Sequence, residues 1–224
     1  MGTLNYSVRI LEKEPLTHDV IRFVLERPEH FEFSAGQAIE LTINQKAFIT
    51  DAAPFTLTGL NSDNNLEIIF KVYPSHNGMT LGMSKLNKGD QLFIGDAWDS
   101  FKYRSAGIFM AGGTGITPFI AILRQLNAVN KLGGNKLLFA NKTAKDIFLR
   151  EELTTLLGSN FINILSREDK DHNSYGRIDQ RFLKDCIYDI NQSFYLCGPG
   201  SFSMDIRSHL INLGVDESSI ISEY

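Results

Sequence analysis

The stretch FMAGGTGITPFIAILRQL, residues 109–126, decides the fold, because it joins an apolar run to a helical pattern through a glycine-rich bend. Glycine lets the backbone turn sharply and lets a ligand approach main-chain N–H groups. Thr117 is the expected N-cap of the helix and Pro118 its first residue. The positive end of such a helix favours a diphosphate. A tight turn that binds nothing fits the bend as well, and Pro118 replaces the third glycine of the usual dinucleotide fingerprint.

The second half of the chain alternates short apolar runs with helical patterns. Strands separated by helices of ten or more residues are typical of a doubly wound α/β domain, in which helices cover both faces of a parallel sheet. The expected strands are residues 106–111, 135–141, 160–166, 193–198 and 220–224, and the expected helices are residues 118–130, 146–158, 178–187 and 201–214.

The first half has the shorter rhythm of antiparallel strands, punctuated by glycine, proline, asparagine and aspartate. Such a pattern predicts an antiparallel β-barrel or sandwich. The expected strands are residues 20–26, 38–44, 66–73 and 90–96, with one short helix near residues 80–86. We therefore predict two domains, an N-terminal antiparallel β-barrel over residues 1–103 and a C-terminal α/β domain with a doubly wound parallel sheet over residues 104–224.

The composition is that of a soluble globular protein, with 43% hydrophobic residues, 21% charged residues and a formal net charge of −4. Lysine and arginine do not gather in one segment, which argues against nucleic acid as the main partner. Cys186 and Cys197 match neither a metal site nor an iron–sulfur motif. No apolar run reaches the length of a membrane span and the first residues lack a signal-peptide core, so we expect a cytoplasmic protein.

Two distant motifs, AGGTGITP at residues 111–118 and YLCGPG at residues 195–200, together resemble the ferredoxin–NADP reductase superfamily. The resemblance covers nearly the whole chain and implies a two-domain flavoprotein. It implies that a pyridine-nucleotide diphosphate binds at Gly113, Thr114, Gly115 and Pro118. It also implies that the nicotinamide meets the flavin at Cys197, Gly198 and Pro199, with Cys197 beside nicotinamide C4.

Taken alone, Cys197 is better interpreted as a small buried residue that ends a strand. Two features favour a binding role for Cys197 instead. A Gly-Pro follows it, and it lies at the carboxyl end of an expected parallel strand, the edge of such sheets at which ligands bind.

The barrel half resembles the flavin-binding segments of the same family. Residues 53–58, APFTLT, align with the motif Arg-x-Tyr-[Ser/Thr], which implies FAD contacts at Pro54, Phe55, Thr56 and Leu57. By this alignment Thr56 places a hydroxyl and an amide near flavin N5. Residues 75–80, SHNGMT, resemble the diphosphate-binding segment, which favours FAD over FMN and implies contacts at Gly78, Met79 and Thr80.

Ala53 departs from this motif, because it occupies the position of the arginine that normally pairs with the flavin diphosphate. A hydrogen bond to a charged group contributes roughly 1.5–3 kcal/mol, so its loss weakens flavin binding. Lys71 and His76 lie nearby in sequence and are the expected replacements, although both are equally well interpreted as solvated surface groups.

The choice of nucleotide depends on the residues after the third α/β strand. Ser166 and Arg167 resemble the Ser-Arg pair that reads a 2′-phosphate, and the planar fork of arginine suits phosphate. Tyr175 is expected to stack on the adenine. The alternative is a solvated polar loop, since the acidic Glu168 and Asp169 repel a phosphate. We expect NADPH, with NADH as the second choice.

The closing residues SSIISEY, 218–224, are apolar enough for a last strand that ends at the same sheet edge as Cys197. The resemblance implies that Tyr224 stacks on the flavin and that Glu223 hydrogen-bonds near the flavin–nicotinamide junction. A last strand without a chemical role is the alternative. The expected catalytic residues are Thr56, Cys197, Glu223 and Tyr224, and no metal is expected.

The resemblance implies a flavin-dependent oxidoreductase that passes electrons from NADPH or NADH through FAD. No span remains for an iron–sulfur domain, so we expect a separate electron carrier, such as a flavodoxin or a ferredoxin. The alternatives are a free-flavin or ferric reductase and the reductase component of an oxygenase. A non-catalytic flavin- or nucleotide-binding sensor or assembly subunit is the alternative of another class, and Ala53 is its best support.

Overall fold

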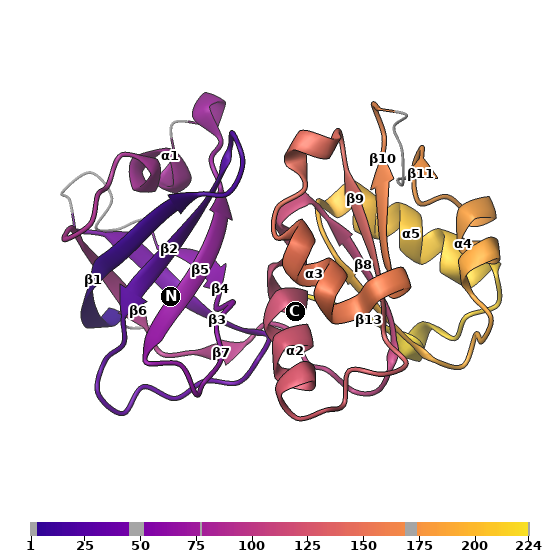
Figure 1. Cartoon of the computed structure of the whole chain (residues 1–224), viewed down its shortest axis with the longest axis horizontal. Coiled ribbons are helices and arrows are strands. Elements are labelled where there is room, and N and C mark those ends of the chain that lie inside the picture. The colour runs from indigo at the N-terminus through magenta and orange to yellow at the C-terminus, as the bar shows by residue number, and fades with distance from the viewer. Residues whose placement is uncertain (1–3, 45–51, 77, 169–173, 224) are drawn as a thin grey trace.

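The computed structural model describes residues 4–44, 52–76, 78–168 and 174–223, which form two sheet-based halves lying side by side (Figure 1). The first half is a nearly closed antiparallel barrel and the second is a parallel sheet covered by helices on both faces. This confirms the predicted fold class. The division at residues 103 and 104 falls between the two sheets and stays a prediction.

The barrel alternates buried and exposed side chains along its strands, so that one face forms a closed core. Within the described residues its strand order is β4-β3-β6-β1-β2-β5, with β7 paired to β3, and all of these pairs are antiparallel. A single bridge between Leu57 and Ile68 joins the two ends of this order. The elements are β1 (Leu4–Pro15), β2 (Val20–Glu26), β3 (Gln37–Ile43), β4 (Ala53–Thr56), β5 (Asn65–Lys71), the 3-10 turn η1 (Pro74–His76), α1 (Met79–Ser84), β6 (Gln91–Gly95) and β7 (Trp98–Asp99).

The parallel sheet has the order β11-β10-β9-β8-β12-β13 in the described part of the chain. Its strands are β8 (Gly107–Gly112), β9 (Lys136–Asn141), β10 (Phe161–Leu165), β11 (Ser174–Tyr175), β12 (Ser193–Cys197) and β13 (Ile220–Ser222). Its helices are α2 (Thr117–Ala128), α3 (Arg150–Leu157), α4 (Gln180–Cys186) and α5 (Gly200–Asn212), with 3-10 turns η2 (Gly113–Ile116), η3 (Ala144–Asp146), η4 (Gly158–Asn160) and η5 (Glu217–Ser219).

The order of the parallel strands reverses direction between β8 and β12. The chain leaves β8 toward β9 and β10 and later returns to the other side of β8 as β12, where Ala111 pairs with Cys197. Helices α2 and α3 cover the sheet face nearer the barrel, and α4 and α5 cover the other face (Figure 1). Ligands of open parallel sheets bind at the carboxyl ends of the strands beside such a reversal.

The helix after the glycine bend begins differently from the prediction. The 3-10 turn η2 runs directly into α2, so Thr117 is already helical and Ile116 is the N-cap, without a side-chain cap. Thr117 Oγ1 instead donates a hydrogen bond to the carbonyl oxygen of Thr114 (3.0 Å). Pro118 is therefore the second helical residue, where its missing N–H leaves no helical hydrogen bond unmade.

One arginine and a shared apolar core join the two halves. Val20, Ile69 and Phe101 pack in the same buried cluster as the side chains of α2. Arg124 Nη1 of α2 donates to the Thr58 carbonyl oxygen (2.9 Å) and to Glu67 Oε1 (2.6 Å) of the barrel, and its Nε and Nη2 donate to Glu152 of α3. Burial acts to lower the pKa of Arg124, but its hydrogen bonds and charges with Glu152 and Glu67 outweigh burial and raise it.

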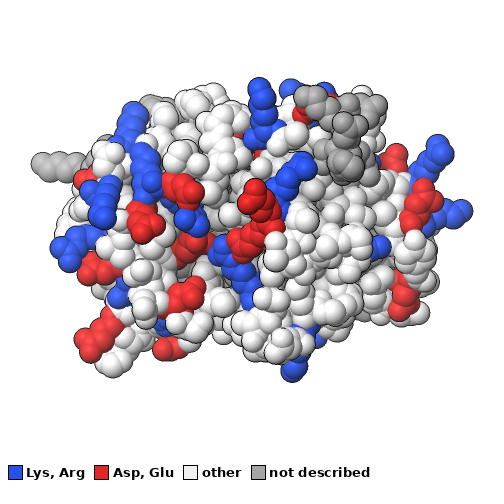
Figure 2. Space-filling model, viewed as in Figure 1, with Lys and Arg blue, Asp and Glu red and all other residues white. Residues whose placement is uncertain are grey.

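Charges of both signs are intermingled on the face shown in Figure 2, both over the barrel and along the junction between the halves. In the described residues, no helix combines the length and the apolar character that a membrane crossing requires.

Candidate functional site

A cleft of about 800 Å³ lies between the barrel and the carboxyl edge of the parallel sheet. Its volume falls within the roughly 300–1,000 Å³ typical of small-molecule sites. Predicted site residues that line it are Pro54, Phe55, Thr56, Lys71, Thr80, Gly113, Thr114, Gly115, Ser166, Cys197, Gly198, Pro199 and Glu223. The structure thus brings the two sequence motifs and the barrel motif to one cavity.

The other predicted residues that the structure describes do not line this cleft. Leu57 is fully buried in the barrel core, Pro118 is buried in α2, and Gly78 and Met79 stand at the start of α1. Arg167 is exposed and Tyr175 is 65% exposed. Tyr224 and the side chain of His76 lie outside the described residues.

The glycines of the bend are explained by backbone geometry. Gly113 has a φ of +55°, which favours glycine, and a side chain there would meet nothing within 4 Å. Gly115 is needed for a close approach instead, because a Cβ atom on it would lie 2.3 Å from the carbonyl oxygen of Cys197. The loop after β8 and the loop after β12 therefore pack against each other and form one continuous wall of the cleft.

Cys197 and Glu223 meet at this wall. Cys197 ends β12 and is 5% exposed, and Glu223 follows β13, which pairs in parallel with β12. This confirms the predicted last strand beside Cys197. Burial raises the pKa of the Cys197 thiol, and the charge and hydrogen bond of Glu223 raise it further. The thiol therefore stays protonated at neutral pH and is a poor nucleophile. Ser100 Oγ donates to Glu223 Oε1 (3.3 Å) and ties this carboxylate to the barrel half.

The barrel side of the cleft is formed mainly by β4 and β5. Phe55 and Thr56 of β4 are 8% and 9% exposed, and the Phe55 ring packs edge-on against Phe70, with 6.1 Å between ring centroids. These buried groups leave an apolar wall with one hydroxyl. Such a wall suits a planar ring system that carries polar atoms on one edge.

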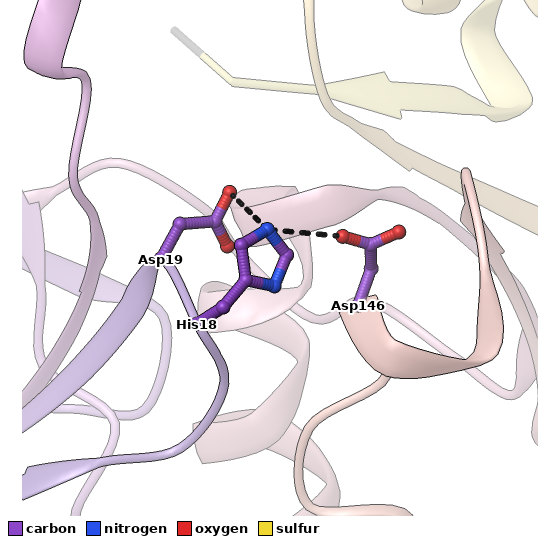
Figure 3. Close-up of side chains that lie close together, drawn as sticks. All are labelled: His18, Asp19 and Asp146. Carbon is purple, nitrogen blue, oxygen red and sulfur yellow. Dashed lines mark ion pairs between the residues drawn. The ribbon is translucent and has the colours of Figure 1, made fainter.

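Lys71, an expected substitute for the missing arginine, is already paired. Its Nζ lies 2.6 Å from Asp19 Oδ2. His18 Nε2 lies 3.5 Å from the same carboxylate and 3.9 Å from Asp146 Oδ1 of the other half (Figure 3). Atoms of His18, Asp19 and Asp146 that could bind a metal lie within 4.8 Å of one another. A metal ion there would have to compete with the Lys71 ammonium for Asp19.

Lys142 and Arg177, which the sequence analysis does not single out, both line the cleft near Ser166. In the described residues no ion pair includes either of them. Lys142 directly follows β9, next to β10 in the sheet. The rule that parallel strands end at one edge would have found it, since Lys142 directly follows an expected strand.

Two family models match the chain. Residues 3–88 match the FAD-binding domain, and residues 109–208 match the oxidoreductase NAD-binding domain. The glycine-rich cradle and the apolar barrel wall fit a flavin and a pyridine nucleotide. So do the cations of Lys142 and Arg177, which form no ion pair with another described residue.

Curated relatives are reductases by name. The chain is 31% identical over 159 residues to NADH–cytochrome b5 reductase 1 of Arabidopsis thaliana, which covers 66% of this chain and 56% of that protein. It is 26% identical over 162 residues to the reductase component of propane 2-monooxygenase from Gordonia sp. (strain TY-5), covering 67% and 44%. The chain thus spans about half the length of these relatives.

A solved structure shares the whole fold. The ferredoxin NADP+ reductase of Neisseria gonorrhoeae, determined with bound FAD and NADP, superposes with a TM-score of 0.85 at 19% identity and covers 97% of each chain. The likeness extends across both sheets and thus includes the way in which they enclose the cleft.

Proposed function

Since the chain belongs to the ferredoxin reductase-like family of two-domain flavoproteins, we propose that it is an NAD(P)H-dependent flavoprotein reductase. It takes electrons from NADPH, or less readily from NADH, and passes them through FAD to a separate carrier such as a flavodoxin or a ferredoxin. The observation that carries this proposal is the single cleft in which Thr56 of the barrel and Cys197 of the parallel sheet line the same space.

Different parts of the chain bind the flavin and the nucleotide. Pro54, Phe55 and Thr56 form the wall for the flavin ring, and the loops at Gly113 and Cys197 receive the nucleotide. When bound, the flavin supplies the ability to accept a hydride and to release electrons singly. The protein supplies alignment and a water-poor contact between the two rings.

Cys197 and Glu223 serve this contact without covalent chemistry. The small protonated thiol of Cys197 permits close approach of the nicotinamide, and Glu223 lies beside it at the end of the neighbouring strand β13. Ser100 holds Glu223 from the barrel side, so the carboxylate stays at the junction where a proton must be held or passed.

The preference for NADPH is supported by three residues that line the cleft. Ser166 offers a hydroxyl, and Lys142 and Arg177 offer positive charges that no described carboxylate neutralises. A 2′-phosphate is recognised by such charge-assisted hydrogen bonds.

A second candidate function, the reductase component of an oxygenase, differs from this proposal only in the protein that accepts the electrons. The similarity to a propane 2-monooxygenase reductase component favours delivery of electrons to an oxygenase. A free-flavin or ferric reductase uses the same cleft with a diffusible acceptor. Mixing the reduced protein with flavodoxin, ferredoxin, oxygenase components, free flavin and ferric chelates ranks these acceptors by the rate of reoxidation.

Anaerobic stopped-flow reduction tests the function itself. Flavin absorbance bands that bleach on mixing with NADPH, and more slowly with NADH, are the expected result. A colourless protein that cannot be reconstituted with FAD would instead favour a non-catalytic sensor or assembly subunit, in line with the missing arginine at Ala53.

A further inference from the structure

The chain segments that carry Lys142, Ser166 and Arg177 leave the parallel sheet next to one another. β9 pairs with β10 and β10 pairs with β11, so these segments start side by side (Figure 1). Lys142 directly follows β9, Ser166 directly follows β10, and Arg177 follows β11 after one glycine. The relative positions of the three side chains therefore depend on what holds the segments together beyond the strands.

Backbone hydrogen bonds continue between the first two segments past the strand ends. The Ser166 N–H donates to the Asn141 carbonyl oxygen (3.0 Å), and the Arg167 N–H donates to the Lys142 carbonyl oxygen (2.9 Å). These bonds keep the main chains of Lys142 and Ser166 adjacent at the edge of the cleft that both residues line.

Glu168 adds a side-chain bond at the far end of this contact. Its Oε2 accepts a hydrogen bond from the Ala144 N–H (2.7 Å). Ala144 is the first residue of η3, and the first N–H groups of a helical turn have no acceptor within the turn. A charged acceptor makes such a bond roughly twice as strong as one between neutral groups. Glu168 thus ties the residue two positions after Lys142 to the segment that carries Ser166.

This bond changes the interpretation of Glu168. From the sequence alone, its negative charge is expected to repel a 2′-phosphate. In the structure, Lys142, Ser166 and Arg177 line the cleft and Glu168 does not. Its carboxylate instead binds the backbone of the neighbouring segment. The acidic side chain is therefore in a position to support the cationic site.

We propose that Glu168 is a positioning residue for the 2′-phosphate of NADPH. This inference rests on the proposed preference for NADPH and adds a residue that acts through Lys142 and Ser166. By fastening the segment after β10 to η3, Glu168 keeps the Ser166 hydroxyl and the Lys142 ammonium close enough to reach one phosphate together. Groups that are ordered before binding give higher affinity than groups that must be ordered on binding.

Two nucleotides without a nicotinamide measure this role apart from hydride transfer. One is 2′,5′-ADP, which carries the 2′-phosphate, and the other is 5′-AMP, which is the same molecule without it. FAD-loaded protein is titrated with each by calorimetry. We expect the parent protein to bind 2′,5′-ADP roughly tenfold or more tightly than 5′-AMP.

Two variants separate the hydrogen bond of Glu168 from its charge. Glu168→Ala removes both, so it should weaken 2′,5′-ADP binding roughly three- to tenfold and leave 5′-AMP binding unchanged. Glu168→Gln removes the charge but keeps an acceptor oxygen, so it should bind both nucleotides within about twofold of the parent. Glu151→Ala is the control for net charge, because it removes an exposed carboxylate of α3 that does not line the cleft.

Steady-state kinetics give a second readout. Glu168→Ala should raise the KM for NADPH by the same roughly three- to tenfold, and leave the KM for NADH and both kcat values nearly unchanged. A merely structural role would affect the two nucleotides alike. Retained flavin absorbance and melting temperature show that each variant is folded.

The proposal is overturned if Glu168→Ala binds 2′,5′-ADP as tightly as the parent or more tightly, which is the result expected from simple repulsion. It is also overturned if 5′-AMP binding weakens by the same factor, or if Glu168→Gln binds 2′,5′-ADP as weakly as Glu168→Ala.

The reductase function fails by a different result. If neither NADPH nor NADH bleaches the flavin of the parent, that function is wrong, while a selective loss of 2′,5′-ADP binding in Glu168→Ala still supports the positioning role. If the parent binds 2′,5′-ADP and 5′-AMP equally, the NADPH preference and the role of Glu168 are both wrong, and a reductase that uses NADH stands.

Discussion

Ala53 stands where the resembled flavin motif has an arginine, and Lys71 does not simply replace that arginine, because its ammonium is held by Asp19 at 2.6 Å. Ala53→Arg should therefore slow the loss of flavin on dilution and tighten binding roughly tenfold or more, as expected for one charge-assisted hydrogen bond. The measurement is the recovery of free-flavin fluorescence over time. Ala53→Met controls for added bulk. Equal release rates from Ala53→Arg and the parent would mean that other groups already hold the diphosphate.

Arg177 and Lys142 are the cations whose removal should change nucleotide preference. Arg177→Ala and Lys142→Ala should each raise the KM for NADPH by roughly tenfold or more and leave the KM for NADH nearly unchanged, because only NADPH carries the 2′-phosphate. Initial rates with both nucleotides provide the measurement. Arg167→Ala is the matched comparison, since this exposed side chain does not line the cleft. A larger effect from Arg167→Ala would restore the sequence-based assignment.

At the scale of residues, the sequence indicates site positions that follow strand ends or family motifs. Thr56, Gly115 and Cys197 were predicted in this way and line one cleft, although their chemical roles stay predictions. Ser100 was not found, because its contact with Glu223 joins positions 123 residues apart in the chain. No local pattern encodes such a pair.

The contact between the loops after β8 and β12 gives a prediction at the scale of elements. In Gly115→Ala, the new Cβ atom would lie only 2.3 Å from the carbonyl oxygen of Cys197, so one of the two loops must move. Overpacking of this kind costs about 1–3 kcal/mol in the free energy of unfolding, and the displaced loop should also weaken nucleotide binding.

Denaturant unfolding and nucleotide titration measure the two effects of this change. Gly133→Ala is the control, because a Cβ there meets nothing within 4 Å and the residue does not line the cleft. If Gly115→Ala were as stable as Gly133→Ala and bound nucleotide as the parent does, the close contact would be relieved without consequence.

Elements with strong periodicity were predicted well and interrupted ones were not. The helix expected over residues 146–158 is divided: η3 ends at Asp146, and α3 begins at Arg150 after Leu149, whose φ is +53°. A single left-handed leucine is imposed by tertiary packing, and its sequence gives no sign of it. The long first strand, β1, buries only Val8 and Ile10, on either side of the exposed Arg9, and then continues through the charged residues Glu12, Lys13 and Glu14, a pattern that does not mark one long strand.

Arg124 is expected to matter for the stability of the whole molecule, because this arginine of α2 binds both the barrel and α3. Arg124→Met removes the cation shared by Glu67 and Glu152, whose side chains are 16% and 32% exposed, and leaves Glu67 only the longer contact of 3.6 Å with Arg22. Removal of one partner from a buried ion pair costs about 3–5 kcal/mol, so a loss near the lower end of this range is expected in the free energy of unfolding.

The matched control is Arg9→Met in the exposed pair Arg9–Glu26, whose side chains are 61% and 43% exposed. Such a pair contributes at most about 1 kcal/mol. Urea unfolding followed by fluorescence and by circular dichroism compares the two variants. An Arg124→Met protein that loses no more stability than Arg9→Met would show that the other contacts between the halves, among them the apolar core around Phe101, suffice to join them.

The way in which the halves meet is the part of the fold that sequence patterns do not contain. Strand and helix periodicity describes one element at a time, whereas the contact of Arg124 with Glu67 depends on how α2 lies against β5. The same holds for Gly36, where φ is +93° and a Cβ would lie 2.4 Å from the Phe101 carbonyl oxygen.

The arginine bridge also sets a rule for recombination between relatives. A chimera that joins the barrel of this protein to a foreign nucleotide-binding half, with its crossover between β7 and β8, leaves both sheets intact but separates Arg124 from Glu67. Successful hybrids must therefore import the acidic partner along with the helix, or replace both with an apolar pair of similar size. In a shuffled library, survivors should show these two distant positions inherited together.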